Sequence, residues 1–521
     1  MIPVTVPAII TQPVTMHATA HVMMPVTVHA IPPVTVHATV HVIPAAADKM
    51  RKEELVWCDE YIADIKPYIY VRIKDSLLIL IPNEAYKLNS SSLYILKEMM
   101  AGRKILDILG EKFGENIPQN VIDETHWFFC DLRSLASGHM CNIDKRRAVE
   151  IKPFERPHNT LPVLSEIALT YRCNLACRFC YAGCNCKKEP LSFENAKDKI
   201  KETLKGFSYK STVGKTSSDK ITKDMTSEEA KKVLYMIKNS AEVPSVSFTG
   251  GEPTLRSDLC DLVAYATEIG LRVNLISNGT QLTEDYVKRL KNAGLKSAQI
   301  SLEGGSAKIH DSLTQVQGSF EKTVRGVKLL QDADIHVHTN TTLNQVNVPY
   351  ADELVEFIGT LGTERFSMNL CIPTKATVAA SLSVTYTDIV PTIEHIQKKA
   401  DSLGLEFMWY SPTPYCIFNP VTAKLGGKSC AACDGLLSVA PNGDVLPCSS
   451  LPKPVGNILK DGFEKVWEGK KASYWRSRSY ADPTCRKCEM FQVCAMACPI
   501  YFDYMGCGEL KEKFDEINGK G

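Results

Sequence analysis

Short apolar runs and amphipathic stretches alternate through the middle of this chain. The apolar runs lie at about 164–170, 245–249, 271–276, 297–302, 335–341 and 365–370, and helical periodicity occupies 227–239, 284–293 and 320–331. Repeated alternation of strands and helices predicts a parallel sheet with crossover helices, which is an α/β fold. Functional side chains in such folds gather at the carboxyl ends of the strands.

A smaller pattern precedes this region. Residues 69–71 and 77–82 alternate or run apolar like paired strands, with Lys74 and Asp75 as the turn between them. Helical patterns follow at 91–100, 104–113 and 121–135. Strands followed by three helices predict a small winged-helix-like domain.

Three cysteines in one short run carry the clearest chemical signal. Cys173, Cys177 and Cys180 have the spacing Cys-x3-Cys-x2-Cys, which is too tight for a disulfide framework. Three thiolates can hold three irons of a 4Fe-4S cluster, and the fourth iron then stays open for a ligand, as in a catalytic zinc site. The alternative is a three-cysteine part of an ordinary zinc or ferredoxin site.

A glycine-rich turn follows the second predicted strand. The run VSFT is followed at once by Gly250, Gly251, Glu252 and Pro253, where two glycines allow a close backbone approach and the proline stiffens the exit. Two later strands end in small polar residues, among them Ser277 and Ser301.

The cysteine run, with Phe179 and Tyr181 around its last cysteine, and the GGEP turn together resemble the signature of the radical S-adenosylmethionine (SAM) enzymes. This resemblance implies a partial (β/α)6 barrel, a 4Fe-4S cluster on the three cysteines and a bound SAM. It implies a set of cofactor-binding residues: Phe179, Gly250, Gly251, Glu252, Pro253, Ser277 and Ser301. Related enzymes often carry an arginine for the SAM carboxylate where this chain has Thr314, so that partner stays open.

A second group of cysteines lies near the end of the chain. After Cys433, Gly443 and Cys448 come Cys485-x2-Cys488-x5-Cys494-x3-Cys498 and then Cys507, which resembles the SPASM pattern of peptide-modifying radical SAM enzymes. With Cys430 as an eighth thiolate, the family's interleaving implies two auxiliary 4Fe-4S clusters. Their implied ligands are Cys430, Cys433, Cys448 and Cys498 for one, and Cys485, Cys488, Cys494 and Cys507 for the other. Cys416 is a rival for the place of Cys430, and a pair of zinc sites is the alternative.

Eight cysteines remain outside these sets: Cys58, Cys130, Cys141, Cys184, Cys186, Cys260, Cys371 and Cys416. Most are expected to be ordinary semi-buried residues. Cys184 and Cys186 follow the first three cysteines closely, so a ligand or substrate role stays open for them beside the structural one.

The front domain resembles the PqqD-like module that recognises the leader of a ribosomally made peptide. The resemblance rests on the stretch DSLLILIPNEAYKLNSSSLYILKEMMAGRKILDIL. It implies that a leader binds as an added strand on a sheet edge. A DNA-binding winged helix is the alternative, but the domain has no basic recognition helix.

Composition limits the remaining possibilities for binding partners and cellular location. The chain has 521 residues, with 60 basic and 59 acidic side chains, so its charge predicts no nucleic-acid partner. No apolar run reaches the length of a membrane helix, and the cysteine spacings without a secretion signal favour the cytoplasm. The near-copies of PVTVHATVHVIP at the start hold five histidines: His17, His21, His29, His37 and His41. This repeat is expected to be disordered rather than metal-binding.

The predicted organisation is therefore a disordered segment (1–48), a PqqD-like domain (49–145), a radical SAM barrel (146–375) and a SPASM domain (376–521). The resemblance implies that SAM is cleaved reductively, with electrons from a flavodoxin or ferredoxin, to modify a precursor peptide. No acid or base residue is assigned. Three alternatives stay open: a tetrapyrrole-modifying enzyme, a sulfatase-maturase-like enzyme and a non-catalytic iron–sulfur electron carrier. The second is weakened by Ser449, which stands where sulfatase maturases carry an aspartate.

Overall fold

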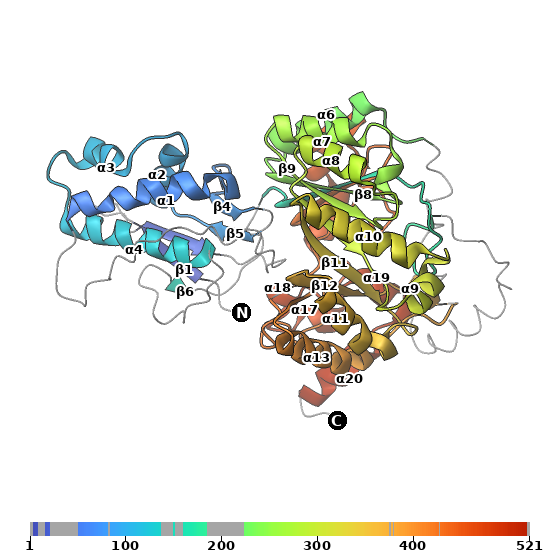
Figure 1. The fold of residues 1–521 in the computed structure, drawn as a ribbon. Coiled ribbons are helices and arrows are strands. Elements are labelled where there is room, and N and C mark those ends of the chain that lie inside the picture. Colours follow the sequence, from blue (N-terminus) through green and yellow to red (C-terminus); the bar gives the residue numbers. More distant parts are fainter. Residues whose placement is uncertain are drawn as a thin grey trace. The chain divides into compact units, whose positions relative to one another are not determined.

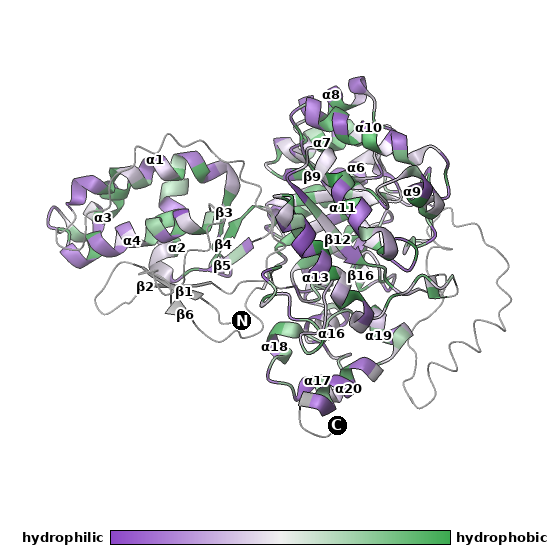
Figure 2. Cartoon of the chain, turned by 60° about the horizontal axis from the view of Figure 1, so that its bottom comes forward, coloured by the Kyte–Doolittle hydropathy of each residue, from purple (hydrophilic) through white to green (hydrophobic). Residues whose placement is uncertain are grey.

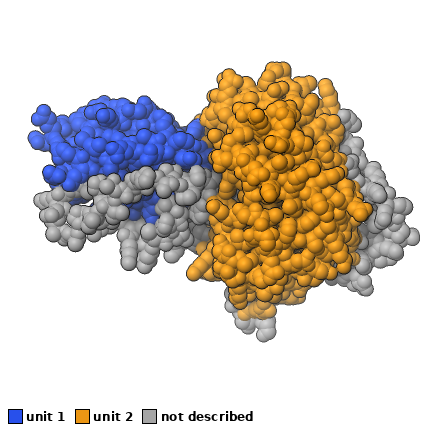
Figure 3. All heavy atoms as spheres, in the orientation of Figure 1, with its two compact units in different colours: residues 1–163 blue, residues 164–521 orange. Residues whose placement is uncertain are grey.

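The chain forms two compact units, residues 1–163 and 164–521 (Figure 3). The structure is a computed structural model, and it describes residues 4–8, 16–20, 51–81, 84–136, 150–151, 160–184, 223–374, 377–378, 380–426 and 428–517. Cys141 and Cys186 lie outside the described residues, as does most of the histidine-containing repeat. No helix in the described part of the chain is both long enough and apolar enough to cross a membrane.

The first unit contains the small domain that the strand and helix patterns predict. Its antiparallel sheet has the order β3-β4-β5, with β3 at Ile69–Arg72, β4 at Leu77–Leu80 and β5 at Glu84–Lys87. Its helices are α1 (Val56–Ile65), α2 (Ser90–Met100), α3 (Ile105–Phe113) and α4 (Gln119–Ala136), and α4 mixes hydrophobic and hydrophilic residues (Figure 2). The sequence patterns missed α1 and β5, and short 3-10 turns at Lys52–Leu55 and Lys66–Tyr68 flank α1.

Two short strands from the start of the chain also belong to this unit. Strand β1 (Val4–Ala8) pairs antiparallel with β2 (Met16–Ala20) and with β6 (Glu150–Ile151). Strands β1 and β2 are the described part of residues 1–48, the segment for which the sequence predicts disorder.

A buried ion pair explains where the first unit ends. Arg72 is 0% exposed, and its Nε lies 2.8 Å from Oδ1 of Asp75. The Arg72 guanidinium also donates to the carbonyl oxygens of Leu161 and Pro162, while Asp75 accepts from the backbone N–H of Thr160. Residues 160–162 are thereby held by the β3–β4 turn. The predicted domain boundary stands at 145/146, whereas the two compact units divide after residue 163.

The second unit is built on one sheet with the order β13-β12-β11-β10-β9-β8-β7-β14-β15-β16. Strands β8, β9, β11 and β12 of this sheet are labelled in Figure 1. All six strands predicted for the barrel are confirmed. They are β7 (Leu164–Thr170), β8 (Ser245–Gly250), β9 (Arg272–Ser277), β10 (Ser297–Ser301), β11 (His336–Leu343) and β12 (Arg365–Leu370). Neighbours among them pair in parallel, as the strand–helix alternation requires. The architecture is an α/β fold with a partial, open barrel.

The sheet continues past the predicted end of the barrel. Strand β13 (Glu406–Trp409) pairs in parallel with β12 on one edge, and β14 (Leu436–Val439) pairs in parallel with β7 near the other. Antiparallel strands β15 (Asp444–Leu446) and β16 (Gly456–Asn457) complete it. These strands were missed because each is shorter than the apolar runs that mark the barrel.

Helices cover one face of the sheet. They are α6 (Ser227–Asn239), α7 (Leu259–Glu268), α8 (Glu284–Asn292), α9 (Ala307–Thr314), α10 (Ser319–Asp332), α11 (Ala351–Thr360) and α13 (Tyr386–Ser402). Thr226 caps α6, because its hydroxyl accepts from Glu229 N–H and the Glu229 carboxylate accepts from Thr226 N–H. Short helices make up the tail: α14 (Ile458–Asp461), α15 (Phe463–Trp467), α16 (Lys470–Arg476), α17 (Pro483–Arg486), α18 (Phe491–Cys494), α19 (Pro499–Met505) and α20 (Gly508–Ile517).

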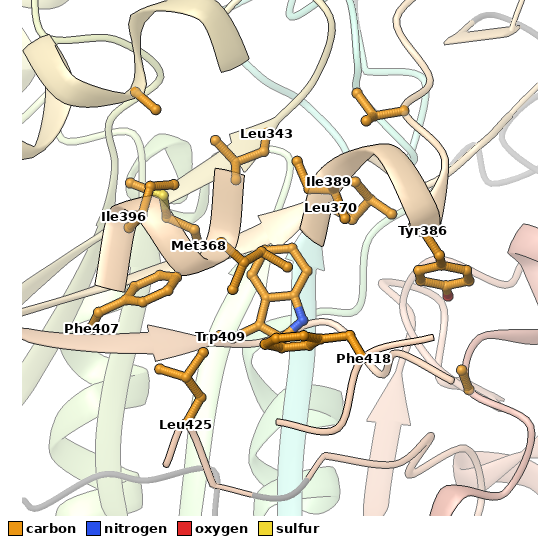
Figure 4. Packing of buried hydrophobic residues seen from close by; sticks show 14 of the residues in the cluster. Leu343, Met368, Leu370, Tyr386, Ile389, Ile396, Phe407, Trp409, Phe418 and Leu425 are labelled. Atoms are coloured by element: carbon orange, nitrogen blue, oxygen red, sulfur yellow. The ribbon is translucent and has the colours of Figure 1, made fainter. Parts of the chain in front are cut away.

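Alternation along the strands sorts their side chains between two faces. Met368 and Leu370 of β12 and Phe407 and Trp409 of β13 pack with Ile389 of α13 in one apolar cluster (Figure 4). The intervening side chains of the same strands point to the opposite face, because successive residues of a strand alternate. That inner face carries the polar residues of the barrel.

Candidate functional site

The GGEP turn is pressed against the end of strand β7. The N–H of Gly251 donates to the carbonyl oxygen of Thr170 at 2.7 Å, and the N–H of Glu252 donates to that of Arg172 at 2.9 Å. A Cβ at Gly250 would lie 2.1 Å from the Thr170 oxygen, and one at Gly251 would lie 2.3 Å from the Arg172 oxygen. Both glycines are therefore required by the close approach of two backbones, immediately before Cys173.

The Glu252 carboxylate joins this turn to the end of strand β9. Glu252 is 0% exposed, and its Oε1 accepts from Ser277 Oγ at 2.8 Å and from both N–H and Oγ1 of Thr254. Its Oε2 accepts from Asn278 N–H at 2.8 Å. Burial raises the pKa of Glu252, and these hydrogen bonds oppose the rise. The side chains of Glu252 and Ser277 are thus hydrogen-bonded to each other. The groups that the GGEP turn offers to a ligand are therefore those of its backbone.

The three-cysteine loop is held by the end of helix α9. Ala176 N–H donates to Thr314 O at 3.0 Å, and Arg178 N–H donates to Leu313 O at 2.9 Å, so the loop satisfies carbonyl groups that a helix end leaves unpaired. Thr314 is 1% exposed, and its hydroxyl is hydrogen-bonded to Ser319 Oγ at 2.7 Å. The side chain at the position where related enzymes often carry an arginine is therefore buried in this chain.

A second anchor ties the loop to the segment that follows strand β9. The Asn174 side chain donates to Thr280 Oγ1 at 2.7 Å and accepts from the Asn278 amide at 2.9 Å. Sequence reasoning missed this asparagine pair, because nothing in the spacing of the motifs links residues about a hundred positions apart.

The three thiols of this loop lie within electrostatic reach of one another. Burial raises the pKa of Cys173 to about 11, with the charges of Glu252 and Cys180 adding to it. Burial also raises the pKa of Cys177, together with the charges of Glu303, Cys180 and Cys173. Iron binding would displace these thiol protons and relieve the repulsion. The donor set therefore fits a cluster held by three thiolates.

The predicted SAM contacts gather around this loop. Ser301 lies half-buried at the end of β10, next to Asn340 of β11, and Phe179 lies partly exposed between Cys177 and Cys180. The GGEP turn and Ser277 end strands β8 and β9. The topology thus brings the residues predicted for cofactor binding to the carboxyl ends of four neighbouring strands.

The cysteines of the tail form two sets. The pKa of Cys448 is raised by burial and by the charges of Cys430 and Cys498, and that of Cys433 is raised by burial to about 12, with the Cys430 charge contributing. Cys430 thus lies near Cys433 and Cys448, and Cys498 lies near Cys448; these are the four residues of the first predicted set. Arg478, which is 2% exposed, holds this loop by donating to the carbonyl oxygen of Cys430 and to Asp434 Oδ2.

A fifth cysteine, Cys416, lies close to the second predicted set. Burial raises the pKa of Cys485 to about 12, with contributions from Cys494, Cys416 and Cys507, and Cys488 contributes to the rise at Cys494. Cys416 is exposed, and the charges of Cys494 and Cys488 contribute to the rise of its pKa, so the structure places it beside the second set.

Among the described side chains, no group of three or more His, Cys, Asp or Glu residues is placed to hold one metal ion. Of the other described cysteines, Cys58, Cys184 and Cys371 are buried and Cys130 and Cys260 are half-buried.

A half-buried glutamate joins the barrel to the tail. Glu166 lies on β7, and its Oε1 accepts from Ser438 Oγ at 2.7 Å and from Ser449 N–H at 3.2 Å. Burial raises its pKa, and these hydrogen bonds oppose the rise. A carboxyl group thus lies beside Ser449, but it is supplied by Glu166 of β7 and not by position 449, where sulfatase maturases carry an aspartate.

Glu303, two residues after the end of β10, is a buried carboxyl group that the motifs did not reveal. It is 3% exposed, its Oε2 accepts from Thr342 N–H at 2.9 Å, and burial raises its pKa to about 8. At pH values between the ordinary glutamate pKa and 8, Glu303 is therefore protonated in the folded state, whereas it has lost this proton in the unfolded chain. The stability linked to this proton is fully present below the ordinary pKa and is lost as the pH rises toward 8.

We expect Glu303→Gln to flatten this pH dependence. The wild-type protein should lose about 2 kcal/mol more unfolding free energy than the variant between pH 6 and pH 8, because one proton is worth ~1.4 kcal/mol per pH unit. Urea denaturation of anaerobically reconstituted protein measures the difference. Glu353→Gln, an exposed change on α11, is the matched control and should keep the wild-type slope. Equal slopes in all three proteins would contradict the buried-proton assignment.

Comparison with known proteins agrees with this geometry. Residues 167–358 match the family model "Radical SAM superfamily", and residues 408–489 match "Iron-sulfur cluster-binding domain" (SPASM). The chain is 29% identical over 290 residues to the AdoMet-dependent heme synthase of Oleidesulfovibrio alaskensis, covering 52% of this chain and 74% of the relative. It is 25% identical over 368 residues to the PqqA peptide cyclase of Rhizobium meliloti, covering 67% and 82%.

A solved structure extends the likeness in fold. Streptococcus suis SuiB bound to its precursor peptide SuiA superposes with a TM-score of 0.58 at 16% identity, covering 83% of this chain and 95% of SuiB. The matched domains carry the 4Fe-4S cluster with SAM and the iron–sulfur centre of the tail. The chain therefore contains a radical SAM domain followed by a SPASM domain, and it is an enzyme.

Proposed function

We propose that this enzyme modifies a ribosomally made precursor peptide. The observation that carries the proposal is the front unit, in which a three-stranded antiparallel sheet and helices α2 to α4 share their own apolar core. Edge strands β3 and β5 offer the backbone on which an extended leader adds as a further strand. The PqqA peptide cyclase among the relatives and the peptide-bound SuiB structure support a peptide substrate.

The chemistry is divided between cofactor and protein. Bound SAM supplies a 5′-deoxyadenosyl radical that removes a hydrogen atom from an unactivated carbon. Cys173, Cys177 and Cys180 would hold the cluster, and the backbone of the turn at 250–253 would orient the amino group of SAM. The barrel would exclude water from the reacting carbon and position this carbon next to the radical. A flavodoxin or ferredoxin would deliver electrons in the cytoplasm.

The tail would complete the electron path. Cys430, Cys433, Cys448 and Cys498 would hold one auxiliary cluster, and Cys485, Cys488, Cys494 and Cys507 the other. Glu166 binds the N–H of Ser449, directly after Cys448, and so positions the first of these sets against β7. These eight thiolates would thus hold two clusters that could supply a site for the electron left after the new bond forms.

Removal of the front unit tests the peptide proposal. A chain without residues 1–163 keeps the whole second unit, so it should still form 5′-deoxyadenosine from SAM and dithionite. It should lose turnover of a peptide encoded by a short reading frame beside the gene, because it lacks the leader-binding edge. The same peptide without its leader, given to the full-length enzyme, is the matched control and should also turn over poorly. Undiminished turnover by the shortened chain would overturn the role of the front unit.

Modification of a haem-type tetrapyrrole is the second candidate. It is favoured by the relatives named AdoMet-dependent heme synthase, one of which is 29% identical over 290 residues. The two candidates separate in one assay, because a tetrapyrrole substrate needs no leader. Consumption of a haem-type tetrapyrrole by the chain without residues 1–163, with no turnover of the peptide, would establish the second candidate.

A further inference from the structure

A buried tyrosine lies beside the first cysteine set of the tail. Tyr480 is 8% exposed, and its hydroxyl makes no hydrogen bond within the described part of the chain. Its ring packs against that of Trp475 of α16, with the ring centres 5.2 Å apart. A buried hydroxyl normally finds a partner, because the loss of its hydration is otherwise uncompensated. Tyr480 thus offers a hydrogen-bond donor that the described chain does not use.

Two thiols of the first set lie close to this hydroxyl. Burial raises the pKa of Tyr480, and the charges of Cys430 and Cys498 add to the rise. The thiol of Cys430 lies within reach of the hydroxyl, although the two groups do not meet in hydrogen-bonding geometry. Arg478 holds the two segments together, because its guanidinium donates to the carbonyl oxygens of Cys430 and Ala432. The Tyr480 hydroxyl is therefore placed at the thiols by packing between distant segments.

An arginine of α16 reaches the same cysteine loop. Arg476 donates from Nε to the carbonyl oxygen of Cys433 at 2.9 Å and from Nη2 to that of Trp467 at 2.8 Å. Its guanidinium also lies over the Trp467 ring, 4.6 Å from the ring centre. Arg478 forms an ion pair with Asp434 at 3.0 Å, whereas the described residues give Arg476 no ion pair. One guanidinium without a direct counter-ion therefore lies beside Cys433.

These groups act against the cost of negative charge at the buried thiols. Burial raises the pKa of Cys433 to about 12, and the charges of Arg476 and Arg478 oppose that rise. At Cys448, the charge of Glu166 acts with the opposite sign. Four thiolates bring negative charge into a poorly hydrated region, and reduction of their cluster by one electron adds more. Hydrogen bonds to sulfur and nearby positive charge favour the reduced form, so they raise the reduction potential.

We propose that Tyr480 and Arg476 raise the reduction potential of the auxiliary cluster held by the first cysteine set of the tail. The Tyr480 hydroxyl serves as a hydrogen-bond donor to the sulfur of Cys430, and the Arg476 guanidinium compensates the charge of the added electron. Both are positioning residues, because they act through the cluster and not on the substrate. The inference rests on the proposed function, which assigns Cys430, Cys433, Cys448 and Cys498 to one cluster.

A redox titration followed by electron paramagnetic resonance tests this role in the anaerobically reconstituted full-length enzyme. The signal of the first auxiliary cluster is identified as the one that Cys433→Ala removes. Tyr480→Phe keeps the ring and loses only the hydroxyl. At the wild-type midpoint, its ratio of reduced to oxidised cluster should fall about ten-fold, which is a downward shift of about 59 mV for one electron. Arg476→Met should shift the potential in the same direction, and Arg476→Lys, which keeps the charge, should restore most of the wild-type value.

Tyr474→Phe is the matched control for Tyr480→Phe. Tyr474 is exposed on the same helix, so its variant should keep the wild-type potential. The Tyr480, Arg476 and Tyr474 variants should all retain about twelve irons per chain, as three 4Fe-4S clusters require.

Three results would overturn the tuning role: an unchanged potential in both Tyr480→Phe and Arg476→Met, an equal shift in Tyr474→Phe, or the loss of about four irons from Tyr480→Phe. Persistence of every signal in Cys433→Ala would overturn the cluster assignment on which the inference rests. Peptide turnover by the wild type is measured in parallel, so failure of the proposed function is recognised separately from failure of the tuning role.

Discussion

Replacing Cys177 with alanine should abolish the formation of 5′-deoxyadenosine from SAM. Cys177 lies in the middle of the loop that α9 and Asn174 hold in place, and its thiol is within electrostatic reach of Cys173 and Cys180. Two thiolates cannot replace three around a cluster that already lacks its fourth protein ligand. The variant should lose about four irons per chain and keep those of the tail, because one 4Fe-4S cluster is lost. Iron analysis and chromatographic detection of the nucleoside measure both effects.

The matched control for this prediction is Cys260→Ala. Cys260 is a half-buried cysteine of α7 outside every predicted ligand set, so the variant should retain its iron and its SAM cleavage. Formation of 5′-deoxyadenosine at the wild-type rate by Cys177→Ala would show that the cluster site lies elsewhere. Loss of all iron from that variant would instead mean that the tail sets do not assemble independently.

Replacing Gly251 with alanine should destabilise the second unit by about 3 kcal/mol or more, because the added methyl group meets rigid atoms. The new Cβ would lie 2.3 Å from Arg172 O, 2.8 Å from Arg172 C and 2.9 Å from Tyr171 C, all of them backbone. Relief requires separation of the GGEP turn from β7, which breaks the hydrogen bond from Gly251 N–H to Thr170 O. We therefore expect weaker SAM binding as well as a lower urea midpoint.

Gly508→Ala provides the comparison for Gly251→Ala. Gly508 starts helix α20 of the same unit, and a Cβ there meets nothing within 4 Å. This control should unfold at or slightly above the wild-type midpoint, because alanine favours a helix over glycine. A Gly251→Ala protein with the stability and SAM affinity of the wild type would show that the turn does not press on β7 as described.

The strand–helix rhythm was sufficient to predict the parallel sheet and its crossover helices, and the family resemblance implied the barrel. Each apolar run became a strand within a few residues, and the ranges of α6, α8 and α10 agree closely with the amphipathic patterns. The reason is local: a run of β-branched and aliphatic residues buries as a strand, and a capping threonine with a glutamate three positions on starts a helix, as at Thr226. The short strands β13 to β16 lack such a signal, because partners already in the sheet decide their pairing.

The spacing of the cysteines by itself determined which thiols share a loop and which chemistry they suit. Cys173, Cys177 and Cys180 are adjacent in any fold of so short a segment, and the same holds for Cys485 and Cys488. Only the tertiary structure decided the contacts between distant segments: Glu252 with Ser277 and Asn278, Glu166 with Ser449, Cys416 beside the second cysteine set, and Arg476 on the carbonyl of Cys433. Such pairs depend on which strands lie side by side. They also depend on the face of the sheet to which each side chain points, which follows from alternation along the strand. That information resides in the packed sheet and not in any one stretch of sequence.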